Sequence, residues 1–292
     1  KIKLKANLMK FTKMHGAGND YVYVNGYVYD DYDWPEISKK ISDRHKGIGS
    51  DGLIVAMPSD NADLRMQMFN ADGSEGEMCG NGIRCLVSFA MEQELIPKDL
   101  VTKSVETNSG TLTVEPIFLD DKMTEAIVDM GKPIFDPDLI PVKVSSDINP
   151  ILQYAIKVDG ISMELAFVSM GNPHAVLFLD ESVDNFNLEK IGPMVQALPI
   201  FPESVNFEIA NILSPDHVKA RVWERGSGLT MACGTGACAI AVVAHLSGFT
   251  GTKINLDMPG GTLNLQWNGS GSSVMMRGPV ETSFHGEWTE AK

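Results

Sequence analysis

The chain has 292 residues, of which 43% are hydrophobic and 21% charged, as in an ordinary soluble globular protein. Its formal net charge of −14 argues against a nucleic-acid partner, because phosphate binding relies on clustered Lys and Arg. No apolar run approaches the roughly 20 residues that cross a bilayer, and no signal-peptide core follows the basic start. We therefore expect a cytoplasmic protein without a membrane partner, and we take Met9 as the native start, with residues 1–8 coming from upstream.

Alternating apolar residues predict strands, and two longer apolar segments predict buried helices. Asp33 followed by Pro35 predicts a helix start, with the helix running towards His45. Helix-length segments follow two Cys-Gly-X-Gly motifs, at Ile83–Leu95 and Ala237–Leu246, and the second is apolar on nearly all sides. The segments typical of strands are Tyr21–Val24, Thr111–Val114, Ala175–Phe178 and Leu263–Leu265.

The chain contains two copies of one pattern. Gly18-Asn19-Asp20 is echoed 153 residues later by Gly171-Asn172-Pro173, and Cys79-Gly80-Asn81-Gly82 is echoed 154 residues later by Cys233-Gly234-Thr235-Gly236. The offset of 154 also relates two further pairs of segments, Gly52–Val55 with Asn206–Ile209 and Arg65–Asn70 with Lys219–Glu224. A repeat of this length has the size of a domain. We therefore expect an α+β fold of two homologous domains related by a pseudo-twofold axis, each a β-rich sheet around a central helix, joined near Leu119–Lys122.

The two Cys-Gly-X-Gly motifs predict a pair of acid–base groups. A helix N-terminus carries partial positive charge and unpaired N–H groups, so a cysteine placed there has a depressed pKa. The flanking glycines let a carboxylate approach the same N–H groups. A thiolate and a thiol on opposite faces of one carbon can invert that carbon by proton transfer. Cys79 and Cys233 therefore predict an amino-acid racemase or epimerase that needs no cofactor, and no pyridoxal motif is present.

Other interpretations of these residues remain open. Cys79 and Cys233 could be buried structural thiols, as we expect for Cys85 and Cys238 in their apolar helices. His174 is either an ordinary turn residue or a group that tunes a thiol. The cysteine spacings lack nearby His partners, so we expect no metal site.

Five sequence blocks resemble the signature blocks of diaminopimelate epimerases and occur in the same order. These blocks are Lys13–Asp20, Phe69–Glu75, Cys79–Cys85, Gly171–His174 and Glu224–Gly236. The resemblance implies that the last strand returns to the first domain. The implied domains are residues 9–122, with a final strand at about 279–292, and residues 123–278. It also implies a function in lysine and peptidoglycan precursor biosynthesis, and a homodimer is compatible with the sequence.

The resemblance implies the residues of the site. Cys79 and Cys233 are the implied catalytic pair, with His174 and Glu224 as supporting polar groups. The implied substrate contacts are Asn19, Asn70, Gly80, Asn81, Asn172, Asn206, Glu224, Arg225, Gly234 and Thr235. For a substrate with an amino acid at each end, we expect the amides of Gly80–Asn81 and Gly234–Thr235 to hold the reacting carboxylate. Arg225 and Glu224 would then hold the far carboxylate and ammonium.

Two positions depart from the family pattern. Gly52 lies where some members have a substrate-contacting Gln, and Leu229 lies where many have Glu. The first departure leaves open a related racemase acting on another amino acid, such as histidine. Proline racemases share the two-cysteine chemistry, and phenazine-biosynthesis-type isomerases share the fold without the cysteines. An inactive amino-acid-binding protein of the same fold is the alternative outside enzymes.

Overall fold

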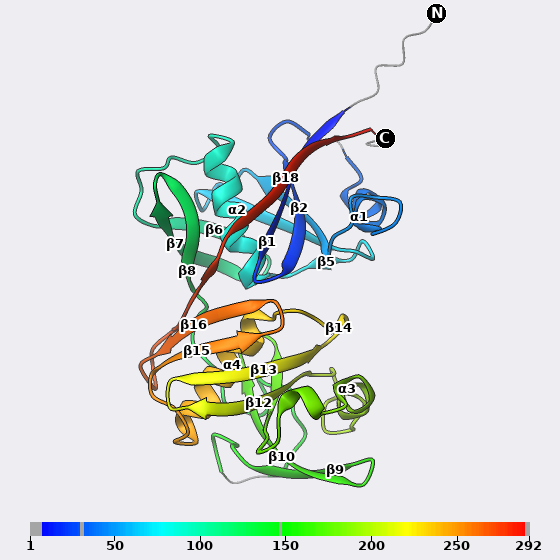
Figure 1. The fold of residues 1–292 in the computed structure, drawn as a ribbon, viewed down its shortest axis with the longest axis vertical. Helices are drawn as coiled ribbons and strands as arrows, with labels where there is room; N and C mark the ends of the chain where they lie inside the picture. Colours follow the sequence, from blue (N-terminus) through cyan, green and yellow to red (C-terminus); the bar gives the residue numbers. More distant parts are fainter. Residues whose placement is uncertain (1–7, 30–31, 146–147, 290–292) are drawn as a thin grey trace, which may run out of the picture. The chain divides into compact units, whose positions relative to one another are not determined.

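The computed structural model describes residues 8–29, 32–145 and 148–289. Seven of the eight residues expected to come from upstream, and the last three of the strand expected at 279–292, lie outside the described residues. Two compact units divide the chain (Figure 1): unit 1 comprises residues 1–128 and 278–292, and unit 2 comprises residues 129–277. Across the described residues, no helix combines the length and apolar character needed to cross a membrane.

The described residues of unit 1 form nine strands. They are β1 (Met9–Gly16), β2 (Asn19–Asn25), β3 (Gly52–Met57), β4 (Leu64–Asn70), β5 (Glu75–Gly76), β6 (Lys103–Thr107), β7 (Gly110–Leu119), β8 (Lys122–Asp129) and β18 (Glu281–Trp288). They pair in the order β18–β1–β2–β3–β4–β6–β7–β8, with β5 on β4. The β2–β3 and β4–β6 pairs are parallel and the others are antiparallel.

Unit 2 repeats this arrangement. Its strands are β9 (Tyr154–Val158), β10 (Ile161–Ser169), β11 (Pro173–Phe178), β12 (Asn206–Ser214), β13 (His217–Glu224), β14 (Gly228–Leu229), β15 (Lys253–Met258), β16 (Gly261–Trp267) and β17 (Val274–Pro279), the last ending at the start of unit 1's final segment. They pair in the order β9–β10–β11–β12–β13–β15–β16–β17, with β14 on β13. The parallel pairs, β11–β12 and β13–β15, stand at the places of β2–β3 and β4–β6. The expected duplication is therefore a property of the fold.

Each unit encloses one helix. Helix α2 (Gly80–Glu92) packs against β1, β2, β3 and β7, and α4 (Gly234–Leu246) packs against β10, β11, β12, β15 and β16. A helix can contact strands so far apart in the sheet order only if the sheet curves around it, as Figure 1 shows for α2. In α4, an apolar sequence on all sides leaves almost every residue buried, as expected for a helix inside a sheet. The predicted fold class is confirmed.

The two remaining α-helices are amphipathic and cover the sheets from outside. Helix α1 (Trp34–Ser42) begins at the expected cap, Asp33, whose carboxylate accepts the N–H of Glu36, and it ends before His45. Helix α3 (Leu188–Gln196) is capped in the same way by Asn187, and a 3₁₀ turn (Val183–Asn185) precedes it. Helices α1 and α3 are 154 residues apart, which extends the duplication beyond the motifs.

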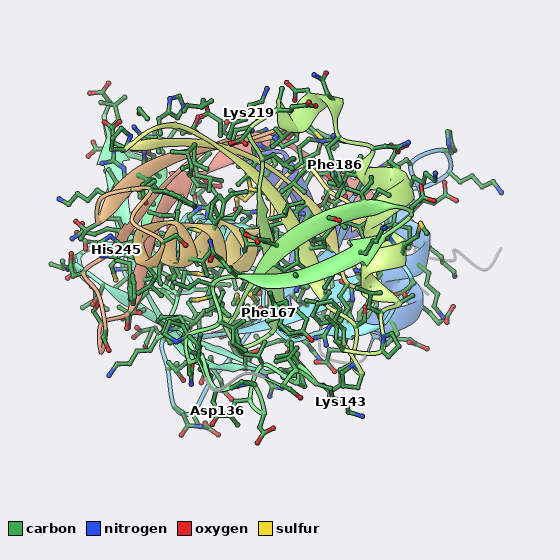
Figure 2. All side chains as sticks on the ribbon, turned by 90° about the horizontal axis from the view of Figure 1, so that it is seen from below. Asp136, Lys143, Phe167, Phe186, Lys219 and His245 are labelled. Carbon is green, nitrogen blue, oxygen red and sulfur yellow. The ribbon has the colours of Figure 1, made fainter. Side chains whose placement is uncertain are left out.

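A cluster of buried hydrophobic residues packs these layers together in each unit. In unit 1, Trp34 and Ile41 of α1 pack against buried residues of β2 and β3. In unit 2, Phe167, which is labelled in Figure 2, belongs to the cluster, and its ring centroid lies 5.6 Å from those of Tyr154 and Phe201.

The charged turn that was expected to join the two domains lies within unit 1 instead. Asp120 and Asp121 form the tight turn between β7 and β8, which are antiparallel neighbours in unit 1. Both residues have positive φ angles, of 49° and 62°, which Asp tolerates in such turns. The division between the units falls later, after Val128. A short charged turn is typical of both a linker and a hairpin, and only strand pairing distinguishes them.

Candidate active site

Cys79 is the N-cap of α2. Its backbone is extended (φ −135°, ψ 114°), and its Sγ accepts the N–H of Gly82 at 3.2 Å. The helix therefore begins at Gly80, three residues before the predicted Ile83. The first N–H groups of a helix have no intrahelical acceptor, so the sulfur lies at the positive end of the helix. The expected location of Cys79 at a helix start is confirmed.

Asn19 contacts Cys79 from the start of β2. Its Oδ1 lies 3.1 Å from Cys79 Sγ, and its Nδ2 donates to Asp51 Oδ2 at 2.7 Å. The bond to Asp51 fixes the amide with its oxygen towards the sulfur, so the Cys79 S–H donates to Asn19. Tyr21, buried beside Cys79, has a pKa raised well above its usual range by burial and by this cysteine.

A charged cluster supports Asp51. Arg44 donates to Asp51 at 2.9 Å and to both oxygens of Asp20, at 2.7 and 3.2 Å, while Lys13 pairs with Asp20 as well. Burial alone would raise the pKa of Asp20, but the hydrogen bonds from Arg44 and Lys13 lower it overall. Asp20 and Asp51 can therefore both lie beside Asn19, since two cations compensate them.

Gly52 and Asn70 lie opposite one another on β3 and β4, and Gly52 also lies opposite Tyr21 on β2. A Cβ atom at Gly52 would lie 2.2 Å from the carbonyl oxygen of Phe69. The backbone of this chain therefore requires glycine where some family members have Gln. The amide of Asn70 donates to Ser74 Oγ at 3.0 Å.

The first turn of α2 is fixed by Arg84, whose side chain is fully buried. Its guanidinium donates to the carbonyl of Gly80 at 3.1 Å, to Asn81 Oδ1 at 2.8 Å and to the carbonyl of Pro279 at 3.3 Å. The Oδ1 atom of Asn81 therefore belongs to this network.

Cys233 is the N-cap of α4 and repeats the geometry of Cys79. Its backbone is extended (φ −125°, ψ 117°), its Sγ accepts the N–H of Gly236 at 3.4 Å, and Thr235 Oγ1 lies 3.5 Å from the sulfur. Helix α4 begins at Gly234, three residues before the predicted Ala237, so Gly234 and Thr235 form its first turn. Cys233 is buried, whereas Cys79 is partly exposed.

A chain of hydrogen bonds leads from the sheet of unit 2 to Cys233. Glu208 Oε1 on β12 lies 2.7 Å from His174 Nδ1 on β11, and His174 Nε2 lies 2.8 Å from Asn172 Oδ1. Asn172 Nδ2 then donates to Thr235 Oγ1 at 3.2 Å. The structure thus brings together the predicted residues Asn172, His174 and Thr235, and it adds Glu208.

His174 and Glu208 are both completely buried. Burial, the largest effect, lowers the pKa of His174 from 6.5 to about 3, and burial raises the pKa of Glu208 well above 4.5. Both shifts favour the neutral forms, in which a single proton lies between Glu208 Oε1 and His174 Nδ1. His174 then carries its own N–H on Nε2, which is the donor that Asn172 Oδ1 requires.

The other predicted polar residues of unit 2 surround the same helix start. Asn206 donates to the carbonyl of Pro173 at 3.0 Å and accepts the backbone N–H of Arg225 at 2.8 Å. The Arg225 side chain is exposed and donates to the carbonyl of Glu203 at 3.3 Å. Glu224 accepts from Thr230.

The surroundings of Cys233 bear on two expectations from the sequence. Glu224 was expected as a supporting group of the catalytic pair as well as at the far end of a substrate, and it hydrogen-bonds to Cys233, while burial raises its pKa. The helix start was expected to lower the pKa of Cys233, yet burial, the largest cause, together with Glu224 raises that pKa well above the usual range. The hydrogen bonds from Thr235 and the Gly236 N–H oppose this shift without reversing it. Cys233 is therefore a thiol in the described form.

The remaining thiols are part of the interior. Cys85 and Cys238 are completely buried, and burial raises the pKa of Cys85 to about 11. The four cysteines all fall within the described residues, and none forms a disulfide. Within those ranges, no group of three or more His, Cys, Asp or Glu side chains is arranged to hold a metal ion.

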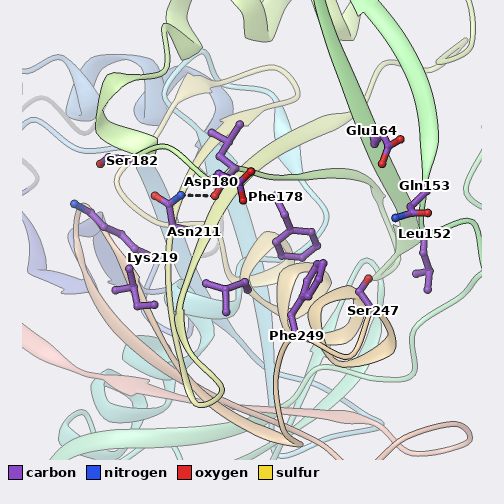
Figure 3. A pocket seen from close by; sticks show the side chains of 13 residues that line it. Leu152, Gln153, Glu164, Phe178, Asp180, Ser182, Asn211, Lys219, Ser247 and Phe249 are labelled. Carbon is purple, nitrogen blue, oxygen red and sulfur yellow. Dashed lines mark hydrogen bonds between the residues drawn. The ribbon is translucent and has the colours of Figure 1, made fainter.

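A surface pocket of about 830 Å³ lies in unit 2 at the opposite end of α4 (Figure 3). Phe178, Phe249 and Ser247 line it, and Ser247 caps the helix that Cys233 begins, roughly 20 Å away at 1.5 Å per residue. Its cation, Lys219, is paired with Asp184. This pocket therefore contributes no group to the chemistry at Cys233.

Glu208 and Asp51 are the supporting residues that the sequence did not reveal. Each has a signal in retrospect. Glu208 interrupts the apolar run of a strand that is buried from Asn206 to Ala210, and Asp51 directly precedes the glycine that starts β3. A buried carboxylate needs a partner, so such a residue in a buried strand indicates a polar network.

The sequence matches the family model described as "Diaminopimelate epimerase" over residues 11–135 and 166–283. Curated relatives of that name are similar over nearly their whole length. One from Desulfovibrio desulfuricans is 46% identical over 285 residues, covering 96% of this chain and 98% of the relative. Another from Methanococcus maripaludis is 45% identical over 279 residues, covering 96% of this chain and 99% of the relative.

Solved structures of lower sequence identity share the fold. A hydroxyproline epimerase from Agrobacterium vitis superposes with a TM-score of 0.69 at 15% identity, covering 96% of this chain and 91% of that chain. A phenazine biosynthesis protein of the PhzF family from Bacillus anthracis gives a TM-score of 0.69 at 14% identity, covering 97% of this chain and 99% of that chain. These similarities concern the fold alone.

Proposed function

Because the chain belongs to the diaminopimelate epimerase family, we propose that it interconverts LL- and meso-diaminopimelate with two cysteines and no cofactor. One sulfur removes the proton from the α-carbon, and the other delivers a proton to the opposite face. One observation carries this mechanism: each cysteine caps a helix and accepts the N–H of the glycine three residues later. Both sulfurs therefore lie where a helix start stabilises negative charge.

The first turns of the two helices bind the reacting carboxylate in this proposal. The N–H groups of Gly80 and Asn81, and those of Gly234 and Thr235, would donate to it. Charge that develops on the carboxylate as the α-proton leaves is then stabilised by donors that are already oriented. No metal ion or electron-withdrawing cofactor takes part.

Asn19 in unit 1 and Glu224 in unit 2 each offer an acceptor for an ammonium group of the substrate. An ammonium that donates to Asn19 Oδ1 competes with the Cys79 S–H for the same oxygen. Substrate binding would thus release Cys79 from its present acceptor and make its proton available for transfer. Glu224, which contacts Cys233, supplies the matching acceptor in unit 2.

The far end of the substrate would meet the remaining polar residues. Arg225 is the exposed cation of the site, and its planar guanidinium suits bidentate binding of a carboxylate. Asn70, Asn172 and Asn206 orient the substrate without adding net charge. We place the reaction in the cytoplasm, in lysine and peptidoglycan precursor biosynthesis, and a homodimer is compatible with it.

The proposal is tested by incubating the protein with LL-diaminopimelate in deuterated buffer. We expect meso-diaminopimelate with deuterium at the inverted α-carbon, because the delivered proton comes from a thiol that exchanges with solvent. Parallel incubations with L-histidine and L-proline test the related racemases. The absence of both exchange and meso product would reject the function, and inversion of histidine alone would replace the substrate.

The roles of the cysteines are tested separately. Cys79→Ala and Cys233→Ala should each abolish epimerisation, because either change removes one of the two proton carriers. Cys238→Ala is the matched control, since it removes a buried sulfur from the same helix as Cys233. An active Cys233→Ala enzyme would contradict the two-base mechanism even if the substrate were correct.

A further inference from the structure

Glu208 lies directly beneath the helix start that carries Cys233. A Cβ atom at Gly236 would lie 2.8 Å from Glu208 Oε1 and 3.3 Å from Cys233 Sγ, so the carboxyl group and the sulfur flank the same point of the first turn. Glu208 is completely buried and contacts His174 at 2.7 Å. Its side chain therefore belongs to the surroundings of Cys233, although it does not bond to the sulfur.

The duplicated unit provides an internal comparison. Tyr21 lies opposite Gly52 in unit 1, as His174 lies opposite Asn206 in unit 2. By the same correspondence, Ile54 of β3 occupies the position of Glu208, and a Cβ at Gly82 would meet Ile54 Cδ1 at 2.6 Å. The same fold position thus accepts an apolar side chain beside Cys79. The buried Glu–His pair is therefore a specific feature of the Cys233 side and not a requirement of the fold.

The protonation of Glu208 follows from its surroundings. Within the described part of the chain, its Oε2 atom is buried without a hydrogen-bond partner. A buried carboxylate with one oxygen unpaired is costly, whereas a neutral carboxyl leaves only a carbonyl oxygen unpaired. Glu208 is therefore the neutral acid, and it donates from Oε1 to His174 Nδ1.

The direction of every later bond follows from that proton. His174 donates from Nε2 to Asn172 Oδ1, which turns Asn172 Nδ2 towards Thr235 Oγ1. Thr235 accepts this bond, and its own hydroxyl proton is then available to the Cys233 sulfur at 3.5 Å. A change at Glu208 can thus reach the sulfur without touching it.

We propose that Glu208 is a positioning residue for Cys233: as a neutral acid it fixes the ring and tautomer of His174, and through Asn172 it orients the Thr235 hydroxyl towards the sulfur. Its effect on catalysis rests on the proposed function, but its effect on the thiol does not.

Several other groups face the same sulfur. Glu224 of β13 contacts Cys233, the Gly236 N–H of α4 donates to it, and Arg225 acts electrostatically on His174. If Glu208 were an anion, it would add to the effect of Glu224, and removing it would lower the pKa of Cys233. If Glu208 is the neutral start of the hydrogen-bond chain, removing it releases the Thr235 hydroxyl, and the pKa of Cys233 rises. The sign of the change in the pKa of Cys233 therefore distinguishes an anionic Glu208 from a neutral one.

The test measures the pKa of Cys233 without substrate. The full-length protein with Cys79→Ser is alkylated with iodoacetamide across a pH series, and the peptide that contains Cys233 is quantified by mass spectrometry. Glu208→Ile reproduces the residue that unit 1 uses at the equivalent position, and Glu208→Gln retains a donor for His174 Nδ1. Ile54→Val is the matched control for a substitution in a buried strand.

We expect Glu208→Ile to raise the pKa of Cys233 by about one unit, which slows alkylation roughly tenfold at a given pH below that pKa. Glu208→Gln should restore the wild-type pKa, and Ile54→Val should leave it unchanged. With Cys79 intact, the same substitutions should affect kcat/KM for epimerisation in the same order. A lower or unchanged pKa in Glu208→Ile would overturn the proposal, as would failure of Glu208→Gln to restore it. A wild-type protein that does not epimerise diaminopimelate would reject the proposed function and leave the thiol measurement valid.

Discussion

Gly236→Ala tests how closely the first turn of α4 packs against Glu208. The added Cβ would lie 2.8 Å from Glu208 Oε1, whereas ordinary contacts begin near 3.4 Å, so the carboxyl group must move by about 0.6 Å. Its hydrogen bond to His174 measures 2.7 Å, and a shift of this size takes it beyond normal hydrogen-bond length. Overpacking of this kind costs about 1–3 kcal/mol. Replacing a helical glycine by alanine returns about 1 kcal/mol.

The expected result is a small loss of stability with a larger loss of activity. The free energy of unfolding should fall by about 0–2 kcal/mol in Gly236→Ala, from the two opposing effects. By contrast, kcat/KM in the deuterium-exchange assay should fall by about tenfold or more. A rise of one unit in the pKa of Cys233 lowers the fraction of its thiolate about tenfold.

Gly82→Ala is the matched substitution in unit 1. Its Cβ would meet Ile54 Cδ1 at 2.6 Å, but this atom is the flexible end of an apolar side chain and can rotate away. We therefore expect a similar change in stability and a smaller loss of kcat/KM than in Gly236→Ala. If Gly236→Ala retained both wild-type stability and wild-type activity, the packing of Glu208 against this turn would be refuted.

Three further outcomes are expected. Cys85→Ala should retain epimerisation, and iodoacetamide should not label Cys85 in the native protein at pH 8, because burial raises the pKa of this thiol to about 11. Tyr23→Phe should lower the free energy of unfolding by about 1 kcal/mol in denaturant titrations, since it removes the 3.1 Å bond from the buried hydroxyl to the carbonyl of Gly82. In the folded protein the pKa of His174 is lowered from 6.5 to about 3 and that of Glu208 is raised above 4.5, so the pair holds one titrating proton between pH 4.5 and 6.5. In the unfolded chain the same two groups also hold one titrating proton in that window. The contribution of this pair to the free energy of unfolding should therefore be constant in that window and fall on either side of it. In Glu208→Gln the contribution of His174 should instead increase from about pH 3 to 6.5. An identical pH dependence in the wild-type protein and in Glu208→Gln would contradict the shared proton.

The duplicated fold could be predicted because its signals are local. Each Cys-Gly-X-Gly motif specifies a helix cap at its cysteine, Cys79 or Cys233, and its glycines let a ligand approach the backbone closely. The constant offset requires only that both copies keep the same spacing. The structure adds that each helix begins at the first glycine of its motif. The pattern of apolar residues cannot locate the first residue of each helix, because the glycines of the motif do not contribute to that pattern.

The electrostatics of the site could not be predicted from the sequence. The helix-start argument considers only the helix to which Cys233 belongs, and that contribution favours the thiolate. The raised pKa arises from burial and from Glu224 on β13, and the hydrogen bonds that lead to Thr235 start at Glu208 on β12. Glu208 reaches the site because β11 and β12 pair in parallel, a pairing that joins segments more than thirty residues apart. Strand β12 is also buried on both faces, so alternation gives no indication of which side chain faces the helix.

The chemical difference between the two units has a consequence for a two-base reaction. The reactive form carries one proton on the two sulfurs together. If two independent thiols shared one pKa, at most about half of the molecules would be in that form at any pH. Separating the two pKa values raises this fraction, and in a duplicated fold only the residues around the caps can separate them. Cys79 has an amide, Asn19, as its acceptor and Ile54 beneath its helix, whereas Cys233 has Glu224 beside it and the Glu208–His174 pair beneath. Selection for turnover near neutral pH would therefore retain the repeated helix starts and diversify the residues of the strands packed against them. The two units show this pattern, with the same helix starts and different residues around them.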